Sequence, residues 1–168
     1  MDLPDVFFAH TEDITREGII GNYVHGNEPA HHVAYLYNYT SQPWKTQKTV
    51  RMILGKQYHN GPDGLGGNDD CGQMSAWYMM SSLGFYPMAP ASDRYELGSP
   101  SVLNATLNLE NGKQFTVEAK NQSAKNVYVK QMLLNGKVLN RLYITHGEIV
   151  GGGKLTFVMA SAPNKKSS

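Results

Sequence analysis

The sequence predicts an α+β protein, with helices and loops over residues 1–90 and an antiparallel β-rich segment over residues 91–163. Before residue 90, apolar residues recur at the three- and four-residue spacing of helices, and after it they alternate with polar residues as in strands. Prolines at 87 and 90 mark the change. We expect the polar, basic stretch 164–168 to be a disordered tail.

Three helices are expected in the first part. Residues 30–39 follow a proline and carry apolar or aromatic side chains on nearly every face, which is typical of a buried helix. A second helix is predicted over 43–58 and a third over 70–83. The third should end at Gly84, because glycine suits the left-handed position after a helix end.

Two Asn-Gly pairs, at 111–112 and 135–136, predict tight turns between strands. Asparagine and glycine tolerate the positive φ angles that such turns require. With the alternating segments around them, these turns predict strands at 105–109, 115–119, 128–134, 138–142 and 155–159.

Charge and cysteine content exclude several function classes. The 168 residues include 15 basic and 14 acidic side chains, a net charge of +1, which argues against nucleic acid or an anionic membrane as partner. No apolar run reaches the roughly 20 residues of a membrane span, and no secretory signal is visible. The single cysteine, Cys71, excludes an internal disulfide and a multi-cysteine zinc site, and we expect it to be buried on a helix.

Residues 25–32 hold three histidines, an asparagine and a glutamate. The adjacent His31 and His32 would diverge by about 100° on a helix, so they suit a shared zinc ion poorly. Asn27 and Glu28, on a loop ahead of a helix, better suit an oxygen-preferring cation or sugar hydroxyls. The alternative is that these two residues only cap the helix.

A second polar cluster opens the helix expected from residue 70. Asp69 and Asp70 follow a glycine-rich loop, and a helix N-terminus stabilises negative charge there. An ionised aspartate in that position could act as a general base toward water. The segment has neither the ligand spacing of a calcium-binding EF-hand loop nor the Gly-Lys-Ser/Thr ending of a phosphate-binding loop. The alternative is an N-cap pair without catalysis.

Several long motifs occur in a fixed order along the chain. They are GNYVHGNEPAHH at 21–32, QPWKTQ at 42–47, GNDDCGQMSAWY at 67–78, LGFYP at 83–87 and YELGSP at 95–100. Together these motifs resemble the family 92 glycoside hydrolases, which are calcium-dependent, inverting exo-α-mannosidases. The resemblance covers nearly the whole chain.

The resemblance implies that residues 1–90 are the C-terminal helices and active-site loops of an (α/α)6 barrel, followed by the small antiparallel β-rich segment. Inverting hydrolysis needs an acid and a base about 6.5–9.5 Å apart. The family's base matches Asp70. Asn68 stands where some members have a second aspartate that assists the water, so an amide replaces that carboxylate.

The same resemblance assigns His25, Asn27, Glu28 and Asp69 to mannose binding, with Asn27 and Glu28 also expected to ligate Ca²⁺. The family's acid, a glutamate in an upstream motif, has no match before residue 21. We therefore expect the C-terminal part of an α-mannosidase that trims mannose-containing glycans, inactive by itself, with exposed barrel faces that favour self-association. The family acts outside the cytoplasm, in extracellular or periplasmic space. A non-catalytic carbohydrate-binding module and a structural remnant are the alternatives.

Overall fold

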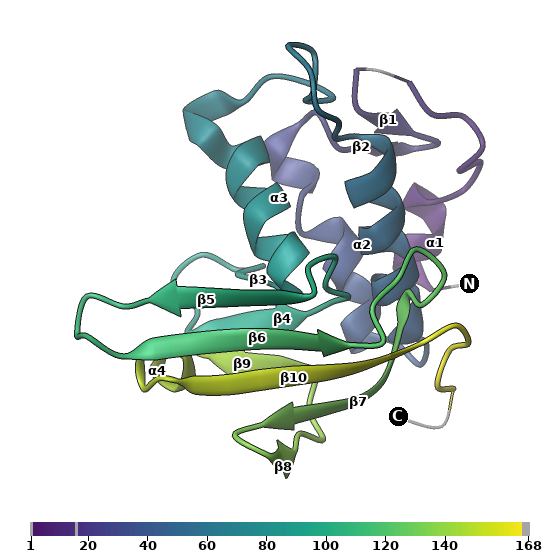
Figure 1. Ribbon diagram of the computed structural model, residues 1–168. Helices are drawn as coiled ribbons and strands as arrows, with labels where there is room; N and C mark the ends of the chain where they lie inside the picture. Colours follow the sequence, from purple (N-terminus) through teal and green to yellow (C-terminus); the bar gives the residue numbers. More distant parts are fainter. Residues whose placement is uncertain (1, 16, 166–168) are drawn as a thin grey trace.

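The computed structural model describes residues 2–15 and 17–165, and it places a helical part above a layered β part (Figure 1). The helical part comprises α1 (Leu3–Phe7), β1 (Ile19–Ile20), β2 (Tyr23–Val24), η1 (Glu28–Ala30), η2 (Val33–Tyr39), α2 (Trp44–Lys56), η3 (Asp70–Gly72) and α3 (Gln73–Leu83). The β part comprises β3 (Phe85–Tyr86), β4 (Arg94–Leu97), β5 (Asn104–Asn108), β6 (Gln114–Lys120), β7 (Tyr128–Leu134), β8 (Lys137–Val138), β9 (Tyr143–Thr145), α4 (His146–Val150) and β10 (Gly153–Ala160). The mixture of helix and sheet agrees with the predicted α+β class.

The segment predicted as one buried helix over 30–39 consists of 3-10 turns, η1 and η2. Four residues of η2 are buried, Val33, Ala34, Tyr35 and Tyr37. A 3-10 helix has three residues per turn and suits short stretches. Apolar side chains on nearly every face of the segment do not distinguish this tighter winding from an α-helix, so the sequence predicted the burial correctly and the helix type wrongly.

The other two helices form close to where they were expected. Helix α2 ends at Lys56, so Tyr58, predicted to lie on it, is instead in the following loop and pairs with Leu65 in an isolated bridge. Helix α3 ends at Leu83, and Gly84, which caps it, has a left-handed φ of 93° as predicted. Within the described part of the chain, no helix has both the length and the apolar character needed to span a membrane.

The main sheet has five strands in the order β5-β6-β10-β7-β8 and is mixed, not antiparallel as predicted. Strand β10 pairs in parallel with β6, from Gly153 beside Phe115 onward, and antiparallel with β7. Alternation of apolar residues is the same in both kinds of pairing, so it could not reveal the parallel neighbour. A second sheet has the order β3-β4-β9.

Both Asn-Gly turns join antiparallel strands. At 135–136 both residues have positive φ, 52° and 80°, as predicted, whereas in the first turn only Gly112 does, at 78°. The strand expected at 138–142 is short, because β8 contains only residues 137–138. Of the tail expected to be disordered, Asn164 and Lys165 are described, with Lys165 Nζ 5.7 Å from the centre of the Trp44 ring. Residues 166–168 lie outside the described residues.

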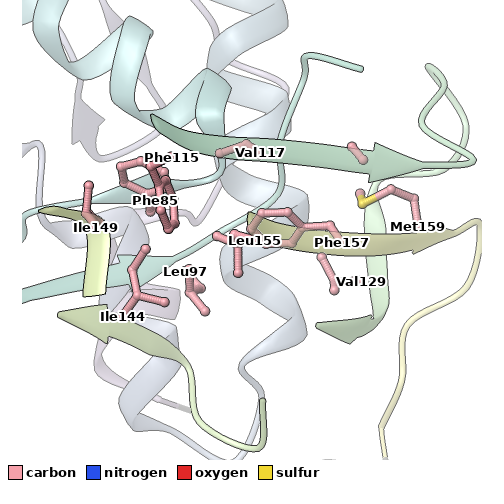
Figure 2. Close-up of a cluster of buried hydrophobic side chains, with 11 residues drawn as sticks. Phe85, Leu97, Phe115, Val117, Val129, Ile144, Ile149, Leu155, Phe157 and Met159 are labelled. Atoms are coloured by element: carbon pink, nitrogen blue, oxygen red, sulfur yellow. The ribbon is translucent and has the colours of Figure 1, made fainter. Parts of the chain in front are cut away.

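Two apolar clusters form the core. The cluster within the β part contains Phe85, Phe115, Leu155 and Phe157, all fully buried (Figure 2). The cluster of the helical part surrounds Trp77, and its other fully buried members are Ile20, Tyr23, Ala34, Tyr35, Val50 and Ile53. Met80 of α3 packs against both clusters. Helix α3 therefore begins next to the loop that carries Asp69 and Asp70 (the acidic loop), and its last turn packs against the sheet.

Candidate active site

The loop before α3 holds Asp69 in place as a helix cap. Its carboxylate accepts hydrogen bonds from the Ser75 backbone N–H, at 3.0 Å, and from the Ser75 hydroxyl, at 2.8 Å. Ser75 is the third residue of α3, so its N–H is one of the groups that has no partner inside the helix. The bond from the Ser75 backbone, followed by that from its side chain, lowers the pKa of Asp69 below its usual value. Asp69 stays ionised and tied to the helix.

The neighbouring Asp70 has different surroundings. Its side chain is exposed, and its carboxylate accepts no hydrogen bond from the described residues. Its backbone N–H donates to Oε1 of Glu28, at 3.3 Å across 42 positions of sequence. The fold thus brings the two polar clusters together, and it leaves the Asp70 carboxylate open to water beside Glu28.

The chain changes direction directly after Asp70. Cys71 and Gly72, the last two residues of η3, both have left-handed backbone angles, with φ of 55° and 76°, directly before α3 begins at Gln73. Asp70 therefore lies on a turn ahead of the helix instead of on the helix itself. Cys71 is exposed, so the prediction that it is a buried helical residue is wrong.

Asn27 and Glu28 lie at the start of η1. Asn27 is exposed, and its side chain makes no capping hydrogen bond, so the alternative in which it only caps the helix is not what the fold uses. Glu28 is half-buried, and its carboxylate contacts the acidic loop through the Asp70 N–H. Asn68 is also exposed, on the glycine-rich loop opposite. Amide and carboxylate oxygens are therefore accessible from both loops.

His25 is fully buried, and both of its ring nitrogens are engaged. Nδ1 lies 2.7 Å from the Tyr23 hydroxyl and Nε2 lies 2.6 Å from the Tyr58 hydroxyl. Burial, reinforced by the nearby His31, lowers the pKa of His25 to about 2, so the ring is neutral. With no ring nitrogen free, His25 does not fit the direct sugar contact predicted for it, and it instead supports the loop that carries Asn27.

A groove of about 430 Å³ begins at Glu28 and continues along α3. Its walls include the polar side chains of His32 and Gln73 and the apolar side chains of Met80 and Met88. Gln73 is held by a hydrogen bond of 2.9 Å from its amide to the Tyr86 hydroxyl. Glu28 is the carboxyl side chain that lines this groove, and the mixture of polar and apolar walls around it suits a ligand with several hydroxyls.

The side chains near Glu28 offer the oxygen atoms that calcium prefers, but they are fewer than a calcium ion needs. Calcium prefers six to eight oxygen ligands. Glu28 and Asn27 supply such oxygens, but the described residues contain no group of three or more His, Cys, Asp or Glu side chains placed to hold a metal ion. Other ligands would have to be backbone carbonyls, water or the hydroxyls of a bound sugar.

The comparison with known families decides the classification. Residues 2–161 match the glycosyl hydrolase family 92 catalytic domain. The chain belongs to glycoside hydrolase family 92. Family 92 membership confirms the resemblance seen in the motifs at 21–32 and 67–78.

Solved family 92 structures share the fold described above. An α-mannosidase of Bacteroides thetaiotaomicron superposes with a TM-score of 0.90 at 51% identity, over 98% of this chain and 22% of that one. The same enzyme in complex with mannoimidazole gives 0.87 at 54% identity, over 89% and 20% of the two chains. A family 92 inverting mannosidase of this bacterium gives 0.82 at 45% identity, over 88% and 20%.

A curated relative, an uncharacterized secreted glycosidase of Arthroderma benhamiae, is 29% identical over 137 residues, which are 80% of this chain and 18% of the relative. The chain therefore spans about a fifth of the length of the proteins it matches.

Two residues of the site escaped sequence reasoning. Ser75, the partner of Asp69, sits within the third predicted helix, where nothing but its spacing of six residues from Asp69 could have indicated a cap bond. Tyr58 was assigned to a helix, yet its hydroxyl lies between His25 and the Met74 carbonyl. No local pattern relates Tyr58 to a histidine 33 positions earlier.

Proposed function

We propose that this chain supplies the base side of the active site of an inverting, calcium-dependent α-mannosidase that hydrolyses terminal α-mannosides of glycans. The observation that carries the proposal is that Asp70 has an exposed side chain while its backbone N–H donates a hydrogen bond to Glu28. Membership of family 92 and the mannoimidazole complex of a similar enzyme support mannose as the sugar.

Asp70 is a better general base than Asp69. A base must present a free lone pair to the water that it deprotonates. Both oxygens of Asp69 accept hydrogen bonds from Ser75, whereas the Asp70 carboxylate is exposed to solvent. Asn68, close by on the same loop, can orient a water molecule through its amide but cannot remove a proton from it.

Asn27 and Glu28 are proposed to bind the mannose and a calcium ion together. A bound calcium ion would ligate sugar hydroxyls and favour distortion of the ring toward the planar, oxocarbenium-like transition state. The Glu28 carboxylate accepts a hydrogen bond from the Asp70 N–H, so this bond joins the binding residue to the residue that carries the base.

The general acid is proposed to come from a barrel segment other than those in this sequence, with the helices of residues 1–90 closing an (α/α)6 barrel. General acid catalysis contributes about 10²–10⁴-fold, so we expect the 168-residue chain alone to be a poor catalyst. The secreted relative supports an extracellular or periplasmic location for the enzyme.

A chimaera tests the role of Asp70. This chain would replace the corresponding part of the 51% identical α-mannosidase, and release of mannose would be measured with and without Asp70→Asn. We expect the substitution to lower kcat by about 10²–10⁴-fold while glycan binding is retained. Glu110→Gln, a matched change on the exposed turn after β5, should leave kcat unchanged.

Two outcomes would contradict the proposal. An Asp70→Asn chimaera that keeps its activity within a factor of two would remove Asp70 as the base. Glycan binding by the 168-residue chain, together with such unchanged activity, would favour a carbohydrate-binding module instead.

A further inference from the structure

A buried chain of hydrogen bonds connects the loop that carries Asn27 and Glu28 to helix α3. It runs from the Tyr23 hydroxyl to His25 Nδ1, at 2.7 Å, and from His25 Nε2 to the Tyr58 hydroxyl, at 2.6 Å. It ends where the Tyr58 hydroxyl donates to the carbonyl oxygen of Met74, the second residue of α3, at 3.1 Å. Met74, Tyr23 and His25 are all fully buried.

The donors and acceptors of this chain allow one arrangement of protons. A carbonyl oxygen can only accept, so the Tyr58 proton points to Met74. The Tyr58 oxygen then accepts from His25, which places the histidine proton on Nε2. Nδ1 is left bare, and it accepts the proton of Tyr23. Each buried polar atom is satisfied, as buried groups in proteins generally are.

A second connection holds the same loop from the other side. His31 Nε2 lies 2.9 Å from the His25 carbonyl oxygen and must donate to it. The indole N–H of Trp77, in the middle of α3, donates to the His31 carbonyl at 3.1 Å. The loop between His25 and His31, which includes Glu28, is therefore tied at both ends to α3.

We propose that Tyr58 is a positioning residue for the proposed active site, a role that rests on the proposed function of Asp70 and Glu28. Its hydroxyl sets the Nε2-protonated form of His25 and holds the start of the 25–31 loop against α3. Tyr58 is itself fixed by the backbone bridge to Leu65 and by stacking on Trp77, with ring centres 6.0 Å apart. Tyr58 thus holds the loop that contains Glu28 at a defined place relative to α3, without itself contacting a sugar.

The first test is spectroscopic and uses the 168-residue chain. Long-range ¹H–¹⁵N correlation spectra should show the proton of His25 on Nε2 in the unmodified protein. Tyr58→Phe removes the acceptor, so we expect a mixture of the two neutral forms of His25. Tyr78→Phe is the matched control, because Tyr78 lies beside Tyr58, is 42% exposed and has no hydrogen bond among the described residues; it should leave His25 unchanged.

The second test measures the spacing of the two loops. Cys71, the only cysteine of the sequence, is exposed and adjacent to Asp70, so a spin label attached to it reports on nearby amides. We expect strong relaxation of the amide signals of residues 26–28, weakened at least twofold by Tyr58→Phe and unchanged by Tyr78→Phe. In the chimaera, Tyr58→Phe should lower kcat/KM by roughly 10–100-fold, with a rise in KM because Glu28 is displaced, whereas Tyr78→Phe should leave both constants unchanged.

Specific results would overturn the inference. A His25 proton on Nδ1 in the unmodified protein would refute the assigned proton order even if Tyr58→Phe failed to fold. Unchanged His25 spectra and unchanged relaxation in Tyr58→Phe would refute the positioning role. Neither spectroscopic test uses mannose or calcium. Failure of the proposed function would instead be seen in the chimaera, where Asp70→Asn would leave kcat unchanged, so the two failures can be told apart.

Discussion

At the scale of single residues, two neighbouring aspartates do different work because their hydrogen bonds differ. Both oxygens of the Asp69 carboxylate accept hydrogen bonds from Ser75, whereas the Asp70 carboxylate is exposed to water. A charged pair at a helix start therefore separates into one structural and one available group. The available group is the one that the proposed hydrolysis requires.

Loss of the cap should be measurable as loss of stability. We expect Asp69→Ala to lower the midpoint of thermal unfolding by about 2–4 °C, because the first N–H groups of α3 lose an acceptor. Ser75→Ala removes only the hydroxyl bond and should have a smaller effect. Circular dichroism melting curves of the two variants provide the measurement, and an equal or larger loss in Ser75→Ala would contradict the capping role.

A second residue-scale prediction concerns Asp5, which lies 2.6 Å from Lys45 Nζ and accepts a bond from the Tyr37 hydroxyl. The Lys45 bond lowers the pKa of Asp5 in the folded protein. Its contribution is therefore present above the unfolded-state pKa of about 3.9 and is lost as pH falls through the lower folded value. For a partly exposed pair we expect no more than about 1 kcal/mol.

Urea unfolding of the unmodified protein and of Asp5→Asn would measure this effect. The difference between their unfolding free energies should be largest near pH 6 and should shrink toward pH 3. A difference that is constant over this range would show that the ion pair adds no pH-dependent stability.

At the scale of elements, backbone conformation decides which glycines are needed. Gly55 lies inside α2, and an added Cβ would meet nothing within 4 Å. Gly136, in the turn between β7 and β8, has equally open surroundings but a φ of 80°. The two positions therefore differ in backbone angle and not in available space.

Alanine at these two glycines should have opposite effects. We expect Gly55→Ala to stabilise the protein by about 0.5–1 kcal/mol, since alanine restricts the unfolded chain and favours helix. Gly136→Ala should destabilise it by roughly 1 kcal/mol, because alanine is strained at positive φ. Chemical unfolding of both variants tests this, and a shift of the same sign in both would contradict it.

At the scale of the whole molecule, the helical and β parts meet at the end of α3. Gly84 has a φ of 93°, and a Cβ there would lie 2.9 Å from Cζ of Phe157 and 3.0 Å from Cδ of Pro100. Phe157 belongs to the buried cluster of the main sheet (Figure 2). This close approach lets the sheet pack directly against the last turn of α3.

Gly84→Ala should therefore be more costly than a change at an open left-handed glycine. We expect a loss of about 2–4 kcal/mol, from backbone strain together with the clash against Phe157. Gly72→Ala, where φ is 76° and no atom lies within 4 Å of the added Cβ, should lose only about 1 kcal/mol. Equal losses by urea unfolding would show that packing at the junction is not the deciding factor.

Helix α3 exposes apolar side chains that favour self-association of the protein. Met79 is 65% exposed, and Tyr78, which precedes it in α3, is 42% exposed. Exposed apolar side chains favour contact with other surfaces. We expect the average sedimentation coefficient to rise with protein concentration and Met79→Lys to reduce that rise; a concentration-independent monomer would contradict the prediction.

The sequence determined the elements that depend on local chemistry. The end of α3 at Gly84, the turn at 135–136 and the division into helical and β parts follow from side-chain periodicity and backbone preference, which act over a few residues. Family membership was also readable, because long motifs in a fixed order carry it.

Tertiary structure alone decided what depends on residues far apart in the chain. The parallel pairing of β6 with β10, the bond of Asp70 to Glu28 and the place of Tyr58 between His25 and α3 each join segments that local patterns treat separately. The physical reason is that hydrogen bonds and packing are satisfied over the whole fold at once. An aspartate, histidine or tyrosine therefore acquires its role from neighbours that the chain supplies only after folding.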